Sequence, residues 1–184
     1  MFSVNNQKRE GKPFPSLFLF VFFAILWIVS NSNAQNLNKY YKVVIQENGK
    51  LYFIEPEIKF RNKKNYCKLF FDLTHLTTND TVSLNFSYSN NIIREIDSIG
   101  FIQDNEKIIS ITKKIFIDAN KTLWYHRYSS KFSFNDLNQI FQTKTSPVIL
   151  LYSKGEVIDF ETSKNEWKKK SELMNRIFSL IKVN

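Results

Sequence analysis

The sequence predicts an α+β fold: mainly antiparallel β-structure, as a sheet or a sandwich, with a short internal helix and a C-terminal amphipathic helix. Apolar and polar residues alternate with the strand period of two over most of residues 40–161. Apolar residues recur with helical spacing at 134–142 and again near the C-terminus. Strands come first and helices gather late, which is typical of α+β domains.

The first predicted element is a hairpin over residues 40–55. It contains Asn48-Gly49, a pair that favours a type I′ turn, and a two-residue loop there would place Glu47 opposite Lys50. Further strands are predicted at 57–60, 66–73, 81–89, 107–112, 113–118 and 122–130, followed by a hairpin at 148–161 that turns at Lys154-Gly155.

Residues 81–89 show the clearest alternation in the chain. Their apolar side chains point to one face and their polar side chains to the other: Val82, Leu84, Phe86 and Tyr88 against Ser83, Asn85, Ser87 and Ser89. This pattern predicts a strand with one face on the core and one in water. Residues 90–103 fit neither period and are predicted to be a connection with some strand. Cys67, the only cysteine, excludes an intrachain disulfide and is predicted to be a small core residue.

Two helices are predicted from apolar stripes and start signals. Ser133 followed by Asp136 resembles a capping box before 134–142, and Ser163 followed by Glu166 makes one for the C-terminal helix. The stripe of the C-terminal helix is expected to pack on the core: Trp167, Met174, Ile177, Phe178 and Ile181.

Residues 1–34 are predicted to be a secretory signal peptide. Basic residues precede an uninterrupted apolar run from Leu17 to Val29, and small residues then lead to a cleavage site between Ala34 and Gln35. As a helix the run of 13 residues would span about 20 Å, whereas a bilayer's hydrocarbon core is about 30 Å thick. The remaining chain, 35–184, is then a single β-rich globular domain.

An uncleaved signal-anchor through residues 14–30 is the alternative, with the domain held outside the membrane. Both predictions place residues 35–184 outside the cytoplasm: in the periplasm, in the cell envelope or in the extracellular space.

The net charge is +9, and loss of three basic and one acidic residue with the signal peptide lowers it to +7. This charge suits an anionic surface, but the codon bias of an AT-rich gene would also produce it, and both explanations stay open.

The sequence favours a non-catalytic domain over an enzyme. It has no Gly-x-Ser-x-Gly elbow and no Gly-rich phosphate loop, and only His75 and His126 could act as histidine bases. Asp72 and His75 lie three residues apart on a predicted strand, so they point to opposite faces and make no metal site. We therefore expect no catalytic residue, no metal and no cofactor, although scattered aspartates leave paired-carboxylate catalysis open.

The stretch "LWYHRYSS" is the densest group of candidate binding residues. Trp124, His126 and Tyr128 share one face of the predicted strand, and Arg127 lies on the other face with Tyr125. Aromatic rings and guanidinium groups are favoured at binding surfaces, so Trp124, His126, Arg127 and Tyr128 form the candidate site. The alternative is that an aromatic-rich chain simply fills both faces of a central strand with such side chains.

The predicted function is that of an exported, non-catalytic β-rich domain with a binding or structural role at the cell envelope or exterior. A glycan, a peptide or an anionic envelope surface is the predicted kind of partner, and export argues against nucleic acid. Two alternatives stay open: the same domain tethered by its signal-anchor, and a small extracytoplasmic hydrolase whose residues assemble only in the fold.

Overall fold

The computed structural model describes residues 37–65, 67–120 and 122–183. The predicted signal peptide, its cleavage site at Ala34 and Gln35, and the alternative anchor lie outside these residues. The segment Leu37–Asn184 forms one compact unit with its own hydrophobic core, which is the condition for independent folding. Within the described ranges, no helix is both long and apolar enough to cross a membrane.

The domain is α+β, which confirms the predicted fold class: the described chain has a ten-stranded antiparallel sheet and two α-helices. The sheet order is β1-β2-β4-β5-β8-β7-β6-β9-β10, and β3 also pairs with β4. In chain order the elements are η1 (Leu37–Lys39), β1 (Tyr41–Gln46), β2 (Gly49–Ile54), β3 (Phe60–Arg61), β4 (Lys68–Leu76), β5 (Thr81–Asn90), β6 (Ser98–Gln103), β7 (Glu106–Asn120), β8 (Leu123–Ser133), α2 (Phe134–Gln142), β9 (Val148–Ser153), β10 (Glu156–Phe160) and α3 (Lys164–Val183).

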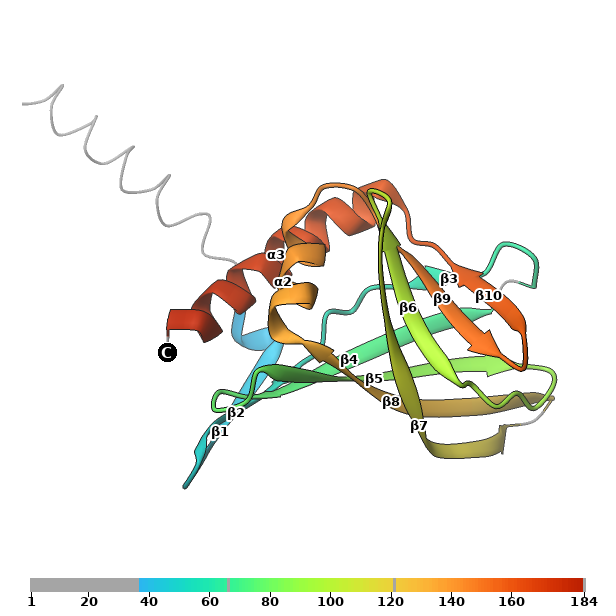
Figure 1. Cartoon of the computed structure of the whole chain (residues 1–184), viewed down its shortest axis with the longest axis horizontal. Helices are drawn as coiled ribbons and strands as arrows, with labels where there is room; N and C mark the ends of the chain where they lie inside the picture. Colours follow the sequence, from blue (N-terminus) through green and yellow to red (C-terminus); the bar gives the residue numbers. More distant parts are fainter. Residues whose placement is uncertain (1–36, 66, 121, 184) are drawn as a thin grey trace, which may run out of the picture. The chain divides into compact units, whose positions relative to one another are not determined.

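The sheet bends back on itself because β7 is long enough to serve two neighbours. Its first half, up to Ile111, pairs with β6, and its second half, from Thr112, pairs with β8. A bridge between Arg61 and Glu161, with N···O distances of 2.7 and 2.9 Å, joins the end of β10 to β3 and so to β4. The strands therefore curve around a common interior. Figure 1 shows β6, β7 and β9 rising steeply from β4, β5 and β8, with α2 and α3 beside them.

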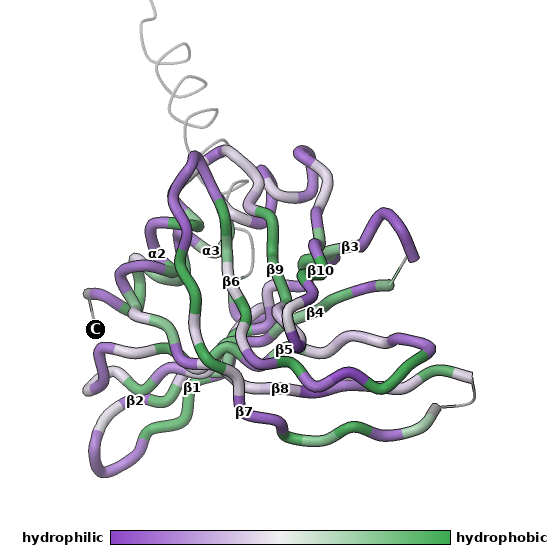
Figure 2. The backbone as a smooth tube through the Cα atoms, turned by 45° about the vertical axis from the view of Figure 1, so that its right-hand side comes forward, coloured by the Kyte–Doolittle hydropathy of each residue, from purple (hydrophilic) through white to green (hydrophobic). Residues whose placement is uncertain are grey.

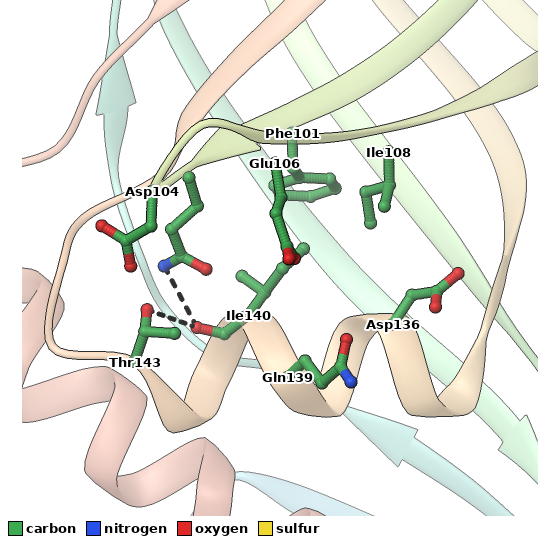
Figure 3. A pocket seen from close by; sticks show the side chains of 9 residues that line it. Phe101, Asp104, Glu106, Ile108, Asp136, Gln139, Ile140 and Thr143 are labelled. Atoms are coloured by element: carbon green, nitrogen blue, oxygen red, sulfur yellow. Dashed lines mark hydrogen bonds between the residues drawn. The ribbon is translucent and has the colours of Figure 1, made fainter.

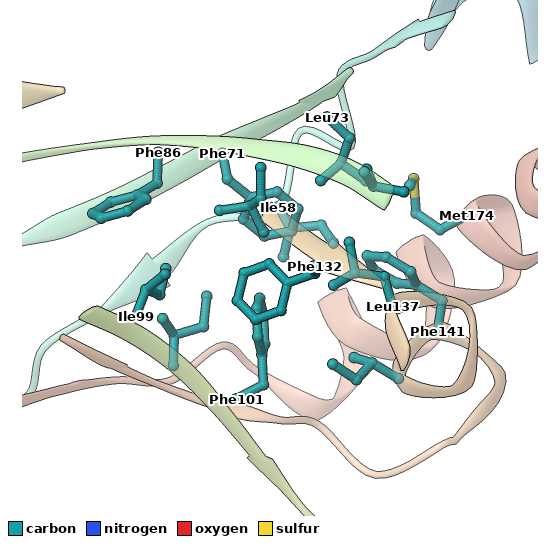
Figure 4. Close-up of a cluster of buried hydrophobic side chains, with 14 of the residues drawn as sticks. Ile58, Phe71, Leu73, Phe86, Ile99, Phe101, Phe132, Leu137, Phe141 and Met174 are labelled. Carbon is teal, nitrogen blue, oxygen red and sulfur yellow. The ribbon is translucent and has the colours of Figure 1, made fainter. Parts of the chain in front are cut away.

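One continuous hydrophobic cluster fills this interior. Figure 4 shows how rings from different strands meet in it: Phe101 of β6 packs edge-on against Phe132 of β8, with centroids 5.5 Å apart. The helices contribute Leu137, Phe141 and Met174 to the same cluster. The five residues predicted as the stripe of the C-terminal helix are all buried, which confirms that prediction.

The first hairpin has a different register from the predicted one. Gln46 pairs with Gly49. The turn residues are therefore Glu47 and Asn48, and neither has a positive φ. Gly49 has a φ of +135°, and a Cβ there would come within 2.8 Å of the Thr77 hydroxyl oxygen. Close approach of the chain at Thr77 requires glycine in the strand rather than in the turn, and local turn preference cannot reveal this.

The chain between β5 and β7 is more regular than predicted. Strand β6, at Ser98–Gln103, forms within the segment predicted as a connection with some strand. Asp104 and Asn105 then turn into β7 with φ values of 49° and 70°. Asp and Asn adopt this left-handed region more readily than most residues, which suits a tight hairpin turn. The two strands predicted at 107–112 and 113–118 are one strand, with a register shift between Lys114 and Phe116.

Both helices begin where the sequence predicts, but their capping differs. Ser133 precedes Phe134 at the start of α2, and its side chain makes no capping hydrogen bond. At the start of α3, the Ser163 hydroxyl accepts the Glu166 N–H at 3.2 Å. The Glu166 carboxylate accepts the N–H of Lys59 at 3.0 Å, which ties the helix start to the segment between β2 and β3.

Candidate functional site

The four residues predicted as a binding site all lie on β8, but on both of its faces. His126 and Tyr128 point inward and are 0% and 1% exposed. Trp124 is half-buried on the same face, whereas Arg127 is half-buried on the opposite, outward face. The structure therefore separates Arg127 from the other three residues.

His126 and Tyr128 hold the loop 91–97 against the inner face of the sheet. Nε2 of His126 accepts the N–H of Arg94 at 3.1 Å. The hydroxyl of Tyr128 accepts the N–H of Ile96 at 3.2 Å and donates to the carbonyl oxygen of Arg94 at 3.1 Å. Buried backbone groups need such partners, so the geometry gives these two side chains a structural role.

Both histidine rings are buried, which favours their neutral form. Burial lowers the pKa of His126, whose ring stacks on Tyr88 with centroids 4.5 Å apart. The nearby backbone groups of Trp124 and Tyr88 raise the pKa of His126 and so partly offset this shift. Among the described residues, no group forms a hydrogen bond with Nδ1 of His126. Burial also lowers the pKa of His75, whose Nδ1 lies 3.1 Å from the carbonyl oxygen of Thr81.

We expect the domain to lose stability as the pH falls below about 6.5, the pKa of histidine in an unfolded chain. Below that pH the unfolded chain binds protons at His75 and His126, whereas the buried rings of the folded chain stay neutral because burial lowers their pKa values. The free energy of unfolding is therefore highest above about pH 6.5 and decreases as the pH falls toward the lower pKa values of the folded state. Urea unfolding at about pH 7.5 and about pH 5.5 measures the effect. The free energy of unfolding should depend less on pH in the double variant His75→Gln/His126→Gln than in the parent chain. An equal pH dependence in the variant and the parent would contradict the prediction.

The outer face of β4, β5 and β8 carries a shallow groove. The ladder registers place Ser87 of β5 beside Phe70 of β4, and Ser89 of β5 beside Tyr125 of β8. The small serines form the floor, and the two aromatic side chains, 40% and 37% exposed, form the walls. The cavity volume is about 370 Å³, within the range of roughly 300–1,000 Å³ that is typical of ligand sites. We call this cavity the β5 groove.

An ion pair borders the β5 groove. Nη2 of Arg127 lies 2.6 and 3.1 Å from the two carboxylate oxygens of Asp72, and Nη1 donates to the Ser87 hydroxyl at 2.9 Å. Asn85 donates to the same Asp72 carboxylate at 3.0 Å. The charged side chains are 32% and 28% exposed, so they are fixed by hydrogen bonds and still accessible to a ligand.

The aromatic surface continues from the β5 groove onto β7. Phe116 faces Arg127 across the β7–β8 ladder and stacks on Tyr125, with centroids 6.2 Å apart and ring planes at 24°. Leu123, 45% exposed, lines the same end of the groove. The outer face therefore presents three exposed rings, those of Phe70, Tyr125 and Phe116, around one guanidinium–carboxylate pair.

Of these groove and ion-pair residues, the sequence-based site contained only Arg127. The alternation of serines along 81–89 and the position of Tyr125 beside Arg127 were the available signals. The missing information was that β5 lies between β4 and β8, which brings the small side chains between the aromatic ones. Cys67, predicted to be a small core residue, is half-buried just before β4 and packs against the hydrophobic core. It also lines the groove, and burial raises the pKa of its thiol.

A second cavity, of about 240 Å³, lies between the β6–β7 turn and α2 (Figure 3). Three carboxylates line it, from Asp104, Glu106 and Asp136. Figure 3 places Asp104 and Asp136 at opposite ends of this cavity. In the part of the chain that the structure describes, no group of three or more His, Cys, Asp or Glu side chains is placed to hold a metal ion.

A third cavity, of about 550 Å³, is lined by His75, Asp80 and Ser133. These residue types could form a nucleophile, a base and an orienting acid, but catalysis would need hydrogen bonds that connect them. The His75 ring instead bonds to the Thr81 carbonyl and packs on Phe134 with centroids 4.8 Å apart. Over the described residues, neither Asp80 nor Ser133 is hydrogen-bonded to the ring, so the geometry favours a structural histidine.

Comparison with known proteins adds no assignment to this geometry. No family model matches the sequence, no curated protein matches it, and no solved structure matches its fold.

Proposed function

We propose that this chain is an exported, non-catalytic binding protein of the cell envelope or exterior, and that the β5 groove binds a glycan. The observation that supports this proposal is the construction of the groove. Phe70 and Tyr125 stand on either side of a serine floor, next to the fixed Arg127–Asp72 pair.

The chemistry of the β5 groove suits a sugar chain. A pyranose ring has an apolar C–H face and a rim of hydroxyl groups. The C–H face can lie on the electron-rich face of Tyr125 or Phe70. The hydroxyl groups can bond to the half-buried Ser89 hydroxyl and to the Arg127–Asp72 pair, which together supply both donors and acceptors.

The same geometry argues against the other predicted partners at this groove. A peptide that adds to a sheet pairs with an unpaired strand edge. The groove lies over β5, whose backbone already pairs with β4 and β8. For a purely anionic ligand, the guanidinium of Arg127 is already paired with Asp72, and Lys68 is the cationic side chain that lines the groove itself.

Export rests on the predicted signal peptide. Mass spectrometry of the N-terminus of the native protein tests it: a mature chain that starts at Gln35 supports a cleaved, free domain. An intact N-terminus in the membrane fraction supports the tethered alternative. Full-length protein in the cytosol would contradict both.

We expect Tyr125→Ala and Phe70→Ala each to weaken glycan binding by about tenfold or more, because each removes one stacking wall. A polysaccharide panel, followed by titration calorimetry with the polymer that binds, measures the affinity. Ile111→Ala is the matched control, since this residue is 82% exposed on the outer surface but does not line the groove.

Cys67 provides a second readout, because it lines the same groove. A bound glycan should slow alkylation of its thiol, and Tyr125→Ala should remove this protection. Unchanged glycan affinity in both Tyr125→Ala and Phe70→Ala would refute the β5 groove as the binding site. If the chain binds no polymer of the panel, a glycan is refuted as the ligand.

A further inference from the structure

The outer surface of β6, β7, β9 and β10 is apolar although it does not face the core. The ladder registers place Ile111, Tyr152 and Val157 in one row across these strands. Ser98 of β6 lies between Ile111 and Tyr152 in this row. The next row holds Ile109 and Leu150, with Gly100 between them and Asp159 of β10 beyond Leu150. We call the surface formed by these five aliphatic and aromatic residues the apolar face, and Figure 2 shows the apolar stretches of β6, β7 and β9 that contribute to it.

The apolar face is strongly exposed. Ile111, Val157 and Ile109 are 82%, 52% and 50% exposed. Leu150 and Tyr152 beside them are half-buried. Outward positions of this sheet do not need to be apolar, because β5 carries serine and asparagine there. A cluster of exposed apolar side chains indicates an interaction site, since its burial is favourable.

Exposed lysines border the apolar face. Lys113 follows Ile111 by two residues on the same side of β7, and Lys107 lies over the Tyr152 ring at 5.1 Å from its centroid. Lys131 lies on the neighbouring strand β8, where its carbonyl accepts a hydrogen bond from a β7 serine. Among the residues with described positions, none of the three has a carboxylate within ion-pair distance. We call these three residues the lysine rim.

We propose that the apolar face and the lysine rim together dock the domain on an anionic lipid bilayer. Aliphatic side chains can enter the boundary between headgroups and acyl chains, while lysines beside them pair with lipid phosphates. A second copy of this chain fits less well, because a two-fold interface through the apolar face would bring two lysine rims together. None of the five residues of the apolar face lines the β5 groove, so the inference does not depend on the glycan site.

Vesicle co-sedimentation of the chain from Gln35 tests this proposal. We expect binding to vesicles of equimolar phosphatidylglycerol and phosphatidylcholine, and little binding to pure phosphatidylcholine. Lys113→Gln and Lys131→Gln should each lower the partition coefficient by about fivefold, and salt should weaken binding. Ile111→Ser should lower it by about fivefold or more, because one aliphatic group no longer enters the interface.

Ile45→Ser on β1 is the matched control. Ile45 is 83% exposed, against 82% for Ile111, but it lies on the first hairpin, away from the lysine rim. This variant should bind vesicles as the parent chain does, and Tyr125→Ala should also leave vesicle binding unchanged. Equal loss in Ile45→Ser and Ile111→Ser, or equal binding to neutral and anionic vesicles, would overturn the proposal. If the parent chain forms a dimer in the absence of vesicles and Ile111→Ser dissociates this dimer, the proposal is overturned and the apolar face is a self-association surface.

Discussion

Replacement of Trp167 by alanine should lower the free energy of unfolding by about 3–5 kcal/mol, the range for removal of a buried aromatic side chain. Trp167 is 0% exposed, stacks on Phe141 with centroids 5.7 Å apart and meets Phe60 edge-on at 6.5 Å. Its Nε1–H also donates to the carbonyl oxygen of Thr143 at 3.3 Å. The side chain therefore joins α3 to β3 and to α2, and its loss leaves a cavity where all three meet.

Urea unfolding followed by far-UV circular dichroism measures this loss. Trp124→Ala is the matched control, because Trp124 is only half-buried near the β7–β8 turn. Trp124→Ala should lower the free energy of unfolding clearly less than Trp167→Ala does. An equal decrease in the two variants would show that the contacts of α3 do not dominate the stability of the domain.

Tyr128→Phe should lower the free energy of unfolding by about 1–3 kcal/mol, the cost of leaving a buried polar group without its partner. The ring stays in place, but the N–H of Ile96 loses its acceptor and the carbonyl of Arg94 loses a donor. The loop 91–97 should therefore open more often. Amide hydrogen exchange at Ile96 reports this opening, and urea unfolding reports the global cost.

Tyr125→Phe is the control for Tyr128→Phe. Both changes remove one hydroxyl from β8, but Tyr125 is 37% exposed on the outer face. Removal of the Tyr125 hydroxyl should change the free energy of unfolding by less than about 0.5 kcal/mol, as is usual for surface positions. Unchanged exchange at Ile96 in Tyr128→Phe would contradict the role assigned to the hydroxyl.

Strand β8 thus serves two purposes through its two faces. Its inward residues, among them His126 and Tyr128, hold the loop 91–97 and fill the core. Its outward residues, Tyr125 and Arg127, contribute to the β5 groove and to the ion pair beside it. A single stretch of sequence that looks like one site therefore contributes one half to stability and the other half to the proposed binding surface.

The local features of this fold could be predicted from the sequence because their causes are local. Side chains alternate across a strand, so the core face of 81–89 followed from residue type alone. The opposite face is half-buried rather than fully in water, and its Ser87 is buried and bonded to Arg127. The bounds of α2 and the buried stripe of α3 followed in the same way from helical spacing. The Lys154-Gly155 turn is present as predicted, because both residues have the positive φ that this hairpin requires.

Strand order, curvature and the candidate site depended on contacts between distant residues. Asp72 and Arg127 are 55 residues apart in the chain and form an ion pair only because β5 lies between β4 and β8. The register at Gly49 depends likewise on its contact with Thr77. Residue type along each element establishes which of its faces is apolar, since backbone geometry sets the period of the side chains. Which polar and aromatic faces adjoin depends on the packing of distant segments, because strand pairing minimises the free energy of the whole core rather than of any one segment.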